Sequence, residues 1–315
     1  MSIKILANDG IDATGKKILE AAGFIVDNNK IPQEELAKHI NNYDVLTVRS
    51  ATKVRKPLID ACTNLKLVVR GGVGLDNIDV EYAEQKGIKV RNTPLASSQS
   101  VAELVFAHLF TGVRFLQESN RLMPTEGIEK FKELKEKYSK GSELSGKTMG
   151  IIGFGNIGKA VTKMALGLGM NVKAYDPYPS KGVFTFNFPG NVSATCEINP
   201  GSKDEVISQS DFITVHSAGS TEVLTADDFK KMKKGVMIVN CARGGVIKEK
   251  ILLEALNNGT VSFAGLDVFE EEPTNNKEIL QHPRISLTPH IGASTTEAQE
   301  RVGKEVADII IKTFS

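Results

Sequence analysis

The stretch Thr148-Met-Gly-Ile-Ile-Gly-Phe-Gly-Asn-Ile-Gly158 decides the fold of this 315-residue chain. Its apolar first half is typical of a short buried strand, and a helical pattern follows the glycines as far as Gly169. A second apolar segment, Asn171–Tyr175, ends on Asp176. Strand, glycine turn, helix, second strand and terminal acid in this register predict a βαβ unit that binds a dinucleotide.

Each glycine of the turn has its own physical reason. Gly153 permits a tight turn, Gly155 lets the backbone approach a pyrophosphate, and Gly158 lets the helix pack closely on the strand. The phosphates would then lie at the positive N-terminus of the helix. A glycine-rich turn without a ligand is the plainer alternative, but it does not account for the second strand and its terminal acid.

Asp176 also indicates which cofactor binds. A carboxylate accepts hydrogen bonds from both ribose hydroxyls of NAD, whereas it repels the 2′-phosphate of NADP, and no arginine follows within residues 177–180. The sequence therefore favours NAD. The alternative is that Asp176 only caps a turn before Pro177.

The composition excludes several classes of protein. Lys and Arg number 39 and Asp and Glu 38, so no excess charge points to a nucleic-acid partner or an anionic membrane. Cys62, Cys196 and Cys241 are odd in number and widely spaced, which indicates neither a disulfide framework nor a zinc site, and we expect no metal. With no leader pattern and no apolar run of membrane-spanning length, we expect a cytoplasmic protein without a membrane partner.

Two series of strands predict two domains. The first ninety or so residues alternate strands with helical stretches, and the expected strands are Lys4–Ala7, Phe24–Val26, Val45–Val48, Leu67–Val69 and Ile88–Val90. The dinucleotide unit continues with Phe212–His216, Val236–Asn240, Ser262–Asp267 and Ile285–Thr288. We therefore expect an α/β protein with two doubly wound parallel-sheet domains and a cleft between them. They are a Rossmann NAD-binding domain at residues 95–284 and a discontinuous flavodoxin-like substrate domain at residues 1–94 plus 285–315.

Three further segments complete the expected architecture. A long helix is expected at Ser97–Glu118, and the charged run Glu126–Lys140 is most simply a solvated helix or loop. The final helix is expected to open with a capping box at Ser294-Thr-Thr-Glu297 and to return to the first domain. The long helix has more apolar side chains than one sheet edge needs, which favours a homodimer. These side chains are Val101, Leu104, Val105, His108 and Leu109.

Three polar residues come at or just beyond strand ends of the second domain, where ligands bind in open α/β sheets. They are Arg243, Glu272 and His290. Oxidation of a secondary alcohol needs a base, for which histidine is suited, while a neighbouring carboxylate can fix its tautomer and a guanidinium can hold a substrate carboxylate. Singly, each residue has a plainer alternative as a surface ion pair, a solvated loop charge or a helix cap.

Taken together, these segments resemble the motifs of the D-isomer-specific 2-hydroxyacid dehydrogenases. The resemblance covers essentially the whole chain and rests on Gly153–Gly158 with Asp176, Val239–Val246, Gly265–Pro273 and Pro289–Thr295. It implies that Arg243, Glu272 and His290 are the catalytic residues.

The resemblance also implies the other residues around the cofactor. Asn156 and Ile157 would line the pyrophosphate turn, and His216 would lie at the adenosine pocket. Asp267 would bind the nicotinamide carboxamide, with the backbone of Cys241 beside it.

Two segments of the first domain, Val48–Lys53 and Val69–Asp76, end adjacent expected strands. They resemble the substrate-holding segments of the D-3-phosphoglycerate dehydrogenases within this family. This implies a small phosphorylated 2-hydroxy acid as the ligand. Backbone N–H groups of Gly72 and Val73 can receive its carboxylate, and Arg49 and Arg70 supply cations for its phosphate. Ion pairs at strand ends are the plainer alternative for these two arginines.

The activity implied is NAD-dependent oxidation of 3-phosphoglycerate to 3-phosphohydroxypyruvate, the first step of serine biosynthesis. A glyoxylate or hydroxypyruvate reductase on the same scaffold and an NAD-sensing co-repressor or binding protein remain as alternatives. The chain departs from the family pattern in Ser97, where an asparagine is common, in an insertion at Val183–Pro200, and in lacking a regulatory domain after the last helix. We therefore expect serine to be a poor inhibitor.

Overall fold

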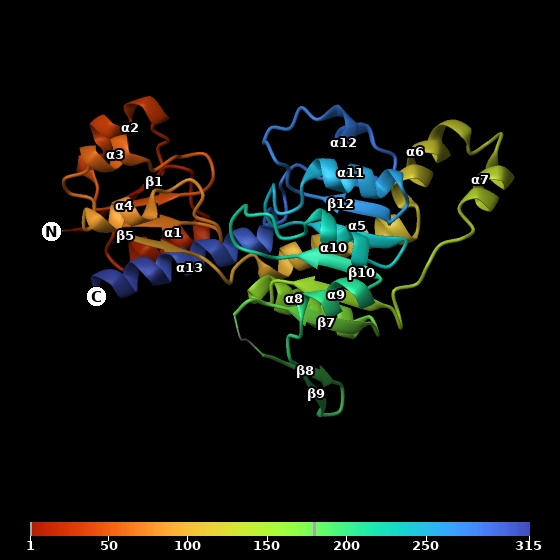
Figure 1. Cartoon of the computed structure of the whole chain (residues 1–315). Helices are drawn as coiled ribbons and strands as arrows, with labels where there is room; N and C mark the ends of the chain where they lie inside the picture. The colour runs from red at the N-terminus through yellow and green to blue at the C-terminus, as the bar shows by residue number, and fades with distance from the viewer. Residues whose placement is uncertain (1, 179–180) are drawn as a thin grey trace. The chain divides into compact units, whose positions relative to one another are not determined.

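The chain folds into two compact units in a computed structural model that describes residues 2–178 and 181–315 (Figure 1). The first unit comprises the chain up to Ser100 together with Ala293–Ser315, and the second is Val101–Gly292. A discontinuous first domain was expected, but its boundaries at residues 94 and 285 need correction. The segment Ile285–Leu287 pairs with the neighbouring strand of the second unit, so the chain returns to the first unit only after Gly292.

The first unit is built on a five-stranded parallel sheet with the strand order β2-β1-β3-β4-β5. This is the flavodoxin-like order, in which the direction of strand addition reverses between β1 and β3. Its elements are β1 (Lys4–Ala7), α1 (Ala13–Ala21), β2 (Ile25–Asp27), α2 (Gln33–His39), η1 (Ile40–Asn42), β3 (Val45–Val48), α3 (Lys56–Ala61), β4 (Leu67–Arg70), α4 (Val80–Gln85), β5 (Lys89–Asn92) and, after the second unit, α13 (Thr296–Phe314).

The two faces of this sheet bury separate clusters of apolar side chains. Leu46 and Val68 pack with helices α2 to α4 on one face, whereas Val45 and Val69 pack with α1 and α13 on the other. Helices α1 and α13 touch at Gly15, where a Cβ would collide with the carbonyl oxygen of a glycine in α13. Backbone contact between these helices holds the returning α13 firmly to the first unit.

The start of α13 differs from the expected capping box at Ser294 and Glu297. Thr295 is the N-cap, and its side chain accepts a hydrogen bond from the N–H of Ala298 at 3.1 Å. The box pattern was wrong by one residue, because either of two consecutive hydroxyl-bearing residues could serve as the cap.

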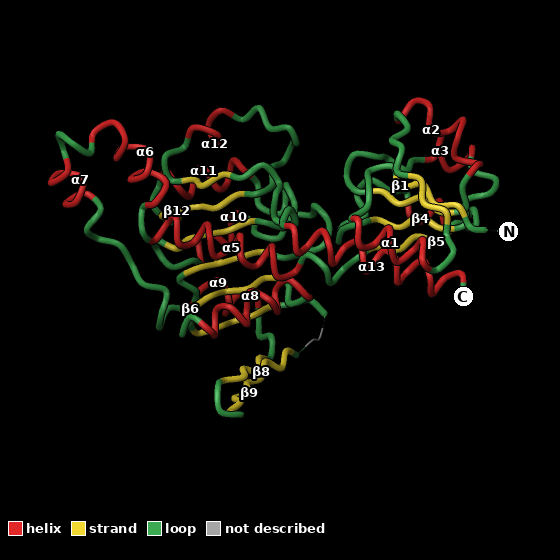
Figure 2. The backbone as a smooth tube through the Cα atoms, turned by 180° about the vertical axis from the view of Figure 1, so that it is seen from behind, coloured by secondary structure: helices red, strands yellow, loops and turns green. Residues whose placement is uncertain are grey.

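The second unit contains a six-stranded parallel sheet with the strand order β13-β12-β11-β10-β6-β7. Helices α5 and α8 cover one face, seen in front of the strands in Figure 2, and α9 to α11 cover the other. The doubly wound Rossmann fold is therefore confirmed. Its elements are α5 (Ser98–Val113), α6 (Leu116–Glu126), α7 (Phe131–Lys137), β6 (Thr148–Ile152), α8 (Asn156–Gly167), β7 (Asn171–Tyr175), β8 (Gly182–Phe188), β9 (Val192–Ile198), α9 (Lys203–Gln209), β10 (Phe212–Val215), α10 (Ala226–Lys231), β11 (Val236–Asn240), α11 (Glu249–Asn257), β12 (Val261–Leu266), α12 (Lys277–Gln281) and β13 (Ile285–Leu287).

Two segments of the second unit differ from the expectation. The helix expected at Ser97–Glu118 breaks at Phe115, whose φ of +55° cannot continue a right-handed helix, so α5 and α6 are separate. The insertion at Val183–Pro200 contains an antiparallel hairpin, in which the side chain of Phe184 is buried against the ring of Phe154.

The apolar side chains of α5 pack in the core of the second unit. Val101, Val105, His108 and Leu109 are buried, and Leu104 is partly buried against the apolar cluster that α5 shares with the sheet. The four buried side chains are therefore not free for a partner chain, and a dimer contact must rest mainly on other residues.

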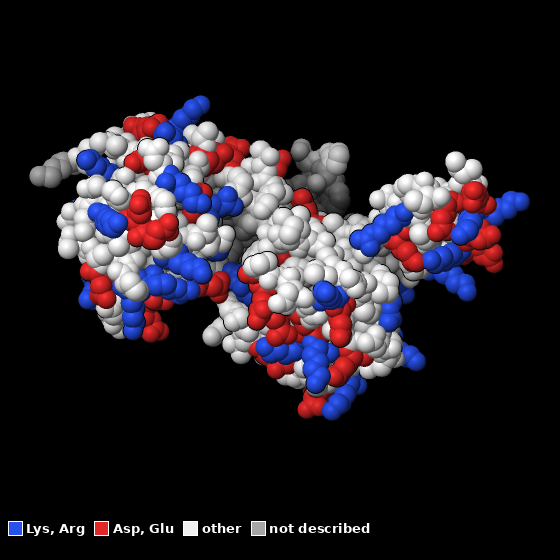
Figure 3. All heavy atoms as spheres, turned by 90° about the horizontal axis from the view of Figure 1, so that it is seen from above, with Lys and Arg blue, Asp and Glu red and all other residues white. Residues whose placement is uncertain are grey.

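The distribution of charged side chains over the surface agrees with the nearly equal numbers of basic and acidic residues. On the face shown in Figure 3, basic and acidic side chains are mixed, without a broad area of one sign. In the part of the chain that the structure describes, no helix combines the length and the apolar character needed to cross a bilayer.

Candidate active site

The glycine turn lies between β6 and β10, where the strand order of the second sheet reverses. Gly153 has a φ of +96°, and a Cβ there would collide with the carbonyl oxygen of His216. A Cβ on Gly158 would likewise collide with the backbone of Gly153. Beyond the neighbours of Gly155, no described atom lies within 4 Å of a Cβ placed there, so the N-terminus of α8 is open and its cradle fits a pyrophosphate.

Asp176 holds the end of β7 against this turn. Its carboxylate accepts hydrogen bonds from the N–H of Phe154 at 2.6 Å and from the N–H of Tyr178 at 2.8 Å. The second bond is the local turn that was the alternative explanation, while the first brings the acid to the glycine turn where a ribose would lie. No arginine occurs in the segment 177–180 that follows Asp176. Its residues Pro179 and Ser180 lie outside the described part of the chain.

His216 lies on the opposite side of the turn and presents an unpaired polar atom. Its Nε2 lies 3.0 Å from the Thr214 hydroxyl, while Nδ1 is buried and has no partner among the described residues. Burial lowers the pKa of His216 to about 3, so the ring is neutral. The next side chain, Ser217, also has a buried hydroxyl without a partner in the described chain, which fits a site that a ligand completes.

Asp267 anchors the loop that carries the candidate base. Its carboxylate accepts hydrogen bonds from the Thr288 hydroxyl at 2.7 Å and from the N–H groups of Ile291 and Gly292 at 2.8 Å each. Its carbonyl oxygen accepts one from the N–H of His290 at 2.9 Å. This positioning role was not foreseen from the sequence, since it depends on a loop more than twenty residues further along the chain.

Glu272 and His290 are brought into direct contact. Nδ1 of His290 lies 2.7 Å from Oε2 of Glu272, and both side chains are partly exposed. The other carboxylate oxygen of Glu272 accepts a hydrogen bond from the N–H of Phe269 at 3.2 Å, which fixes the acid. With Nδ1–H bonded to the carboxylate, Nε2 is left free to exchange a proton.

Arg243 occupies the loop after β11. Asn240 shapes this loop, because its side chain donates to the carbonyl of Arg243 at 2.9 Å and accepts from the N–H of Ala242 at 3.0 Å. Strands β11, β12 and β13 are neighbours, so Arg243, Glu272 and His290 follow the carboxyl ends of three adjacent strands. Cys241 is buried beside them, and burial, followed by the charge of Asp267, raises the pKa of its thiol.

The candidate phosphate ligands of the first unit lie at the ends of the paired strands β3 and β4. The backbone N–H of Arg49 donates to Asp9 at 2.7 Å, and in the part of the chain that the structure describes its guanidinium has no hydrogen-bond or ion-pair partner. The Nε of Arg70 donates to Oδ1 of Asn77 at 3.2 Å. Asn77 also donates to the carbonyls of Arg49 and Thr52, at 2.8 and 2.7 Å.

Asn77 therefore ties both arginine loops together, a role that sequence reasoning missed. It directly follows Val69–Asp76, but nothing in the local sequence indicates that its side chain reaches Arg49 and Thr52. The expectation for Gly72 also needs correction, because its N–H donates to the carbonyl of Arg70 at 2.9 Å. The N–H of Val73 remains as the proposed donor to a carboxylate.

Comparison with known proteins shows what this arrangement is similar to. Residues 106–292 match the D-isomer specific 2-hydroxyacid dehydrogenase family, in its NAD binding domain. The hydroxypyruvate reductase of Thermotoga maritima is 41% identical over 98% of this chain and 97% of its own length. The D-3-phosphoglycerate dehydrogenase of Methanocaldococcus jannaschii is 42% identical over 99% of this chain, which spans only 57% of that protein.

The fold agrees with solved structures. The NAD+-bound 3-phosphoglycerate dehydrogenase of Entamoeba histolytica superposes with a TM-score of 0.77 at 28% identity, covering 100% of this chain and 96% of the other. The expectation of NAD is confirmed by the matching domain and by this neighbour. The chain therefore belongs to the D-isomer specific 2-hydroxyacid dehydrogenases, a family of NAD-dependent oxidoreductases.

Proposed function

We propose that this protein is an NAD-dependent D-3-phosphoglycerate dehydrogenase, which oxidises 3-phosphoglycerate to 3-phosphohydroxypyruvate in the first step of serine biosynthesis. The observation that carries the proposal is the pair of arginines at the ends of β3 and β4. Arg49 has a guanidinium without a partner among the described residues, and Arg70 is oriented by Asn77. An unphosphorylated three-carbon acid offers only one anionic group, whereas a phosphorylated one needs cations at both ends.

The chemistry assigned to the chain follows from the second unit. In the oxidation direction, Nε2 of His290 takes the proton of the C2 hydroxyl, and Glu272 holds the ring in the tautomer that allows this. Bound NAD would accept the hydride that leaves C2. The guanidinium of Arg243 binds the substrate carboxylate and the oxygen that becomes the carbonyl.

The experiment compares two substrates in the reductive direction, 3-phosphohydroxypyruvate and hydroxypyruvate. Arg70→Ala should lower kcat/KM for the phosphorylated substrate roughly tenfold to a hundredfold, with little effect on the other. Arg243→Ala should damage both, because both substrates carry the carboxylate. Arg55→Ala is the matched control, since Arg55 forms a partly exposed ion pair with Asp79 at 2.7 Å in the same unit.

A hydroxypyruvate reductase is the second candidate, favoured by the similarity to the Thermotoga maritima protein along nearly its whole length. In that case the wild type would prefer hydroxypyruvate, and Arg70→Ala would affect the two substrates equally. Either result would remove the phosphoglycerate proposal.

We also propose that the protein is a homodimer and cytoplasmic. Residues 116–137, which contain α6 and α7, form an arm that projects from the sheet of the second unit in Figure 1. Large apolar side chains of this arm are exposed to water. Ile128 is fully exposed, Phe131 is 57% exposed and Met123 is 44% exposed. A second copy of the chain would cover this arm and remove its apolar surface from water. Free thiols at all three cysteines suit a reducing compartment.

Sedimentation velocity tests the dimer. The wild type should sediment as a dimer at micromolar concentration, and Ile128→Asp should shift it toward monomer. Leu280→Asp is the control, because Leu280 is an exposed apolar residue of α12, away from the arm. A monomeric wild type, or equal dissociation of both variants, would rule out the arm as the interface.

A further inference from the structure

His108 is a histidine enclosed between α5 and the sheet of the second unit. It is only 2% exposed, and Val105 and Leu109 are its buried neighbours on the helix. A Cβ on Gly265 of β12 would collide with Cβ and Cγ of His108, so the ring fits against the strand only because residue 265 is a glycine. A ring enclosed in this way needs a hydrogen-bond partner for each of its two nitrogens.

Two hydroxyl groups from the segment that leads to His290 bond to this ring. Nδ1 of His108 lies 2.9 Å from the hydroxyl oxygen of Ser286, and Nε2 lies 3.2 Å from that of Thr288. Ser286 belongs to β13, and Thr288 follows the strand, two residues before His290. The ring therefore connects α5 with the segment from which the proposed base extends.

The hydrogen atoms along these bonds have one consistent arrangement. The Thr288 hydroxyl donates to Oδ1 of Asp267 at 2.7 Å, so its oxygen can only accept from His108, and the proton of the ring must be on Nε2. Burial, which outweighs the opposing effect of the Asp267 charge, lowers the pKa of His108, so the ring is neutral. Nδ1 then has no proton and accepts from the Ser286 hydroxyl.

These bonds lead to the carboxylate that holds the histidine loop. Besides Thr288, the carboxylate of Asp267 accepts from the N–H groups of Ile291 and Gly292, and its carbonyl accepts from the N–H of His290. A hydroxyl hydrogen rotates toward whichever acceptor is available, and the bond from His108 leaves the Thr288 hydroxyl directed at Asp267. Without the ring, Thr288 could turn away, and Asp267 would hold the loop less firmly.

We propose that His108 is a positioning residue for the dehydrogenase reaction, which acts through Thr288 and Asp267 on the loop that carries His290. The proposal rests on the assignment of His290 as the base, and it is the same for either candidate substrate. The proton on Nε2 makes His108 the opposite tautomer to His290, whose Nδ1 carries the proton that bonds to Glu272.

The kinetic test compares two replacements of the ring, with whichever of 3-phosphohydroxypyruvate and hydroxypyruvate the wild type reduces faster. His108→Leu keeps a side chain of similar size and removes both nitrogens. It should lower kcat roughly tenfold or more, because the base is misplaced, and change KM by less than about twofold. His108→Gln keeps an N–H that can reach Thr288, and should restore kcat to within about threefold of the wild type.

The order of these two variants separates positioning from packing. If His108 only filled the core, leucine would replace it better than glutamine, whose amide is more costly to bury. A lower kcat in His108→Gln than in His108→Leu, or a wild-type kcat in His108→Leu, would therefore overturn the proposal.

Thr288→Val breaks the same series of bonds without a change in α5. It should lower kcat at least as much as His108→Leu, and the double variant should lose no more than Thr288→Val alone, because both residues act in one series. Thr111→Val is the control, since the hydroxyl of Thr111 bonds to the carbonyl of Ala107 within α5, and its kcat should equal that of the wild type. Losses that multiply in the double variant would contradict the proposed route.

The tautomer of His108 gives a readout that needs no turnover. NMR of the full chain with ¹⁵N-labelled histidine should show at pH 7 a neutral ring protonated on Nε2, whose signals vanish in His108→Gln and shift in Thr288→Val. A charged ring, or a proton on Nδ1, would overturn the proposal. Full activity of His290→Asn would instead remove the assignment of the base, and would leave the NMR result as it stands.

Discussion

Nδ1 of His290 lies 2.7 Å from Oε2 of Glu272, although eighteen residues separate them in the chain. Asp267 makes this possible, because it accepts hydrogen bonds from the backbone N–H groups of His290, Ile291 and Gly292 and from the hydroxyl of Thr288. A carboxylate on Nδ1 leaves Nε2 as the only ring nitrogen that can act as the base.

Replacing the histidine should separate chemistry from cofactor binding. His290→Asn is expected to lower kcat by ~10² to 10⁴, because general acid-base catalysis is lost. The affinity for NADH, measured by fluorescence titration, should stay within about twofold, because the glycine turn and Asp176 are untouched. His282→Asn is the control on the same unit, and full activity of His290→Asn would exclude His290 as the base.

Asp176 should decide between NAD and NADP through its charge. Asp176→Asn keeps an oxygen that can accept from the N–H of Phe154 but removes the negative charge. We expect kcat/KM with NAD to fall roughly tenfold and the relative use of NADP to rise, since repulsion of the 2′-phosphate is relieved. Steady-state kinetics with both cofactors checks this, and an unchanged ratio would contradict the assignment.

Asn77 should affect the affinity for the substrate but not the rate of the chemical step. Asn77→Ala removes hydrogen bonds to Arg70 and to the carbonyls of Arg49 and Thr52, so the two arginines lose their fixed geometry. KM for 3-phosphohydroxypyruvate is expected to rise roughly tenfold, with kcat changed much less. Asn41→Ala is the control, because among the described residues the side chain of Asn41 bonds only to the backbone of Ala61 and Thr63 in the same unit. A fall in kcat with unchanged KM would argue against a positioning role.

The buried histidine His216 should make stability depend on pH. An unfolded chain protonates this ring near pH 6.5, whereas burial lowers the pKa in the folded chain to about 3. The unfolded state therefore binds more protons between these values, and the free energy of unfolding falls as the pH falls below 6.5, by about 1.4 kcal/mol per pH unit. Urea unfolding at pH 7.5 and 5.0 should show a smaller loss for His216→Asn than for the wild type. His39→Asn, at an exposed site, should behave like the wild type.

The hairpin should contribute to the core of the second unit. Phe184 packs edge-on against Phe154 with ring centroids 6.3 Å apart, and Phe154 is the middle residue of the glycine turn. Phe184→Ala should lower the free energy of unfolding by about 3 kcal/mol and weaken NADH binding, because the turn loses its support. Val183→Ala, on the exposed side of the same strand, should change neither quantity. If the free energy of unfolding of Phe184→Ala equals that of the wild type, the hairpin does not contribute to the core of the second unit.

The sequence predicted those features that depend on local pattern. The alternation of apolar strands with helical stretches predicted both sheets, and the glycines together with Asp176 predicted the cofactor turn in the correct register. The break at Phe115 could not be predicted, because phenylalanine has no preference for a positive φ and only the packing around it imposes one. The side chains of Asn77 and Asp267 bond to residues more than twenty positions away in the chain, and no local sequence pattern predicts such contacts.

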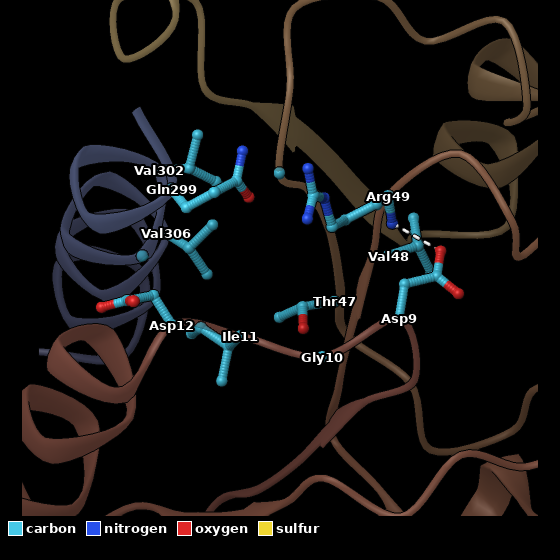
Figure 4. A pocket seen from close by; sticks show the side chains of 12 residues that line it. Asp9, Gly10, Ile11, Asp12, Thr47, Val48, Arg49, Gln299, Val302 and Val306 are labelled. Atoms are coloured by element: carbon cyan, nitrogen blue, oxygen red, sulfur yellow. Dashed lines mark hydrogen bonds between the residues drawn. The ribbon is translucent and has the colours of Figure 1, made fainter. Parts of the chain in front are cut away.

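A cavity of about 270 Å³ beside Arg49 (Figure 4) could not be predicted either. Its walls come from three segments that are far apart in the chain, the loops after β1 and β3 and helix α13.

The passage of the chain through the second unit before α13 has a consequence for synthesis on the ribosome. The face of the first sheet that includes Ile5, Val45 and Val69 is covered by α13 only after residues 101–292 have been made. Until then α1 alone covers this face, so part of its apolar surface stays in water while the whole second unit is translated. We expect a chaperone to bind this face during translation, and a circular permutant that places α13 ahead of β1 to need less help in folding.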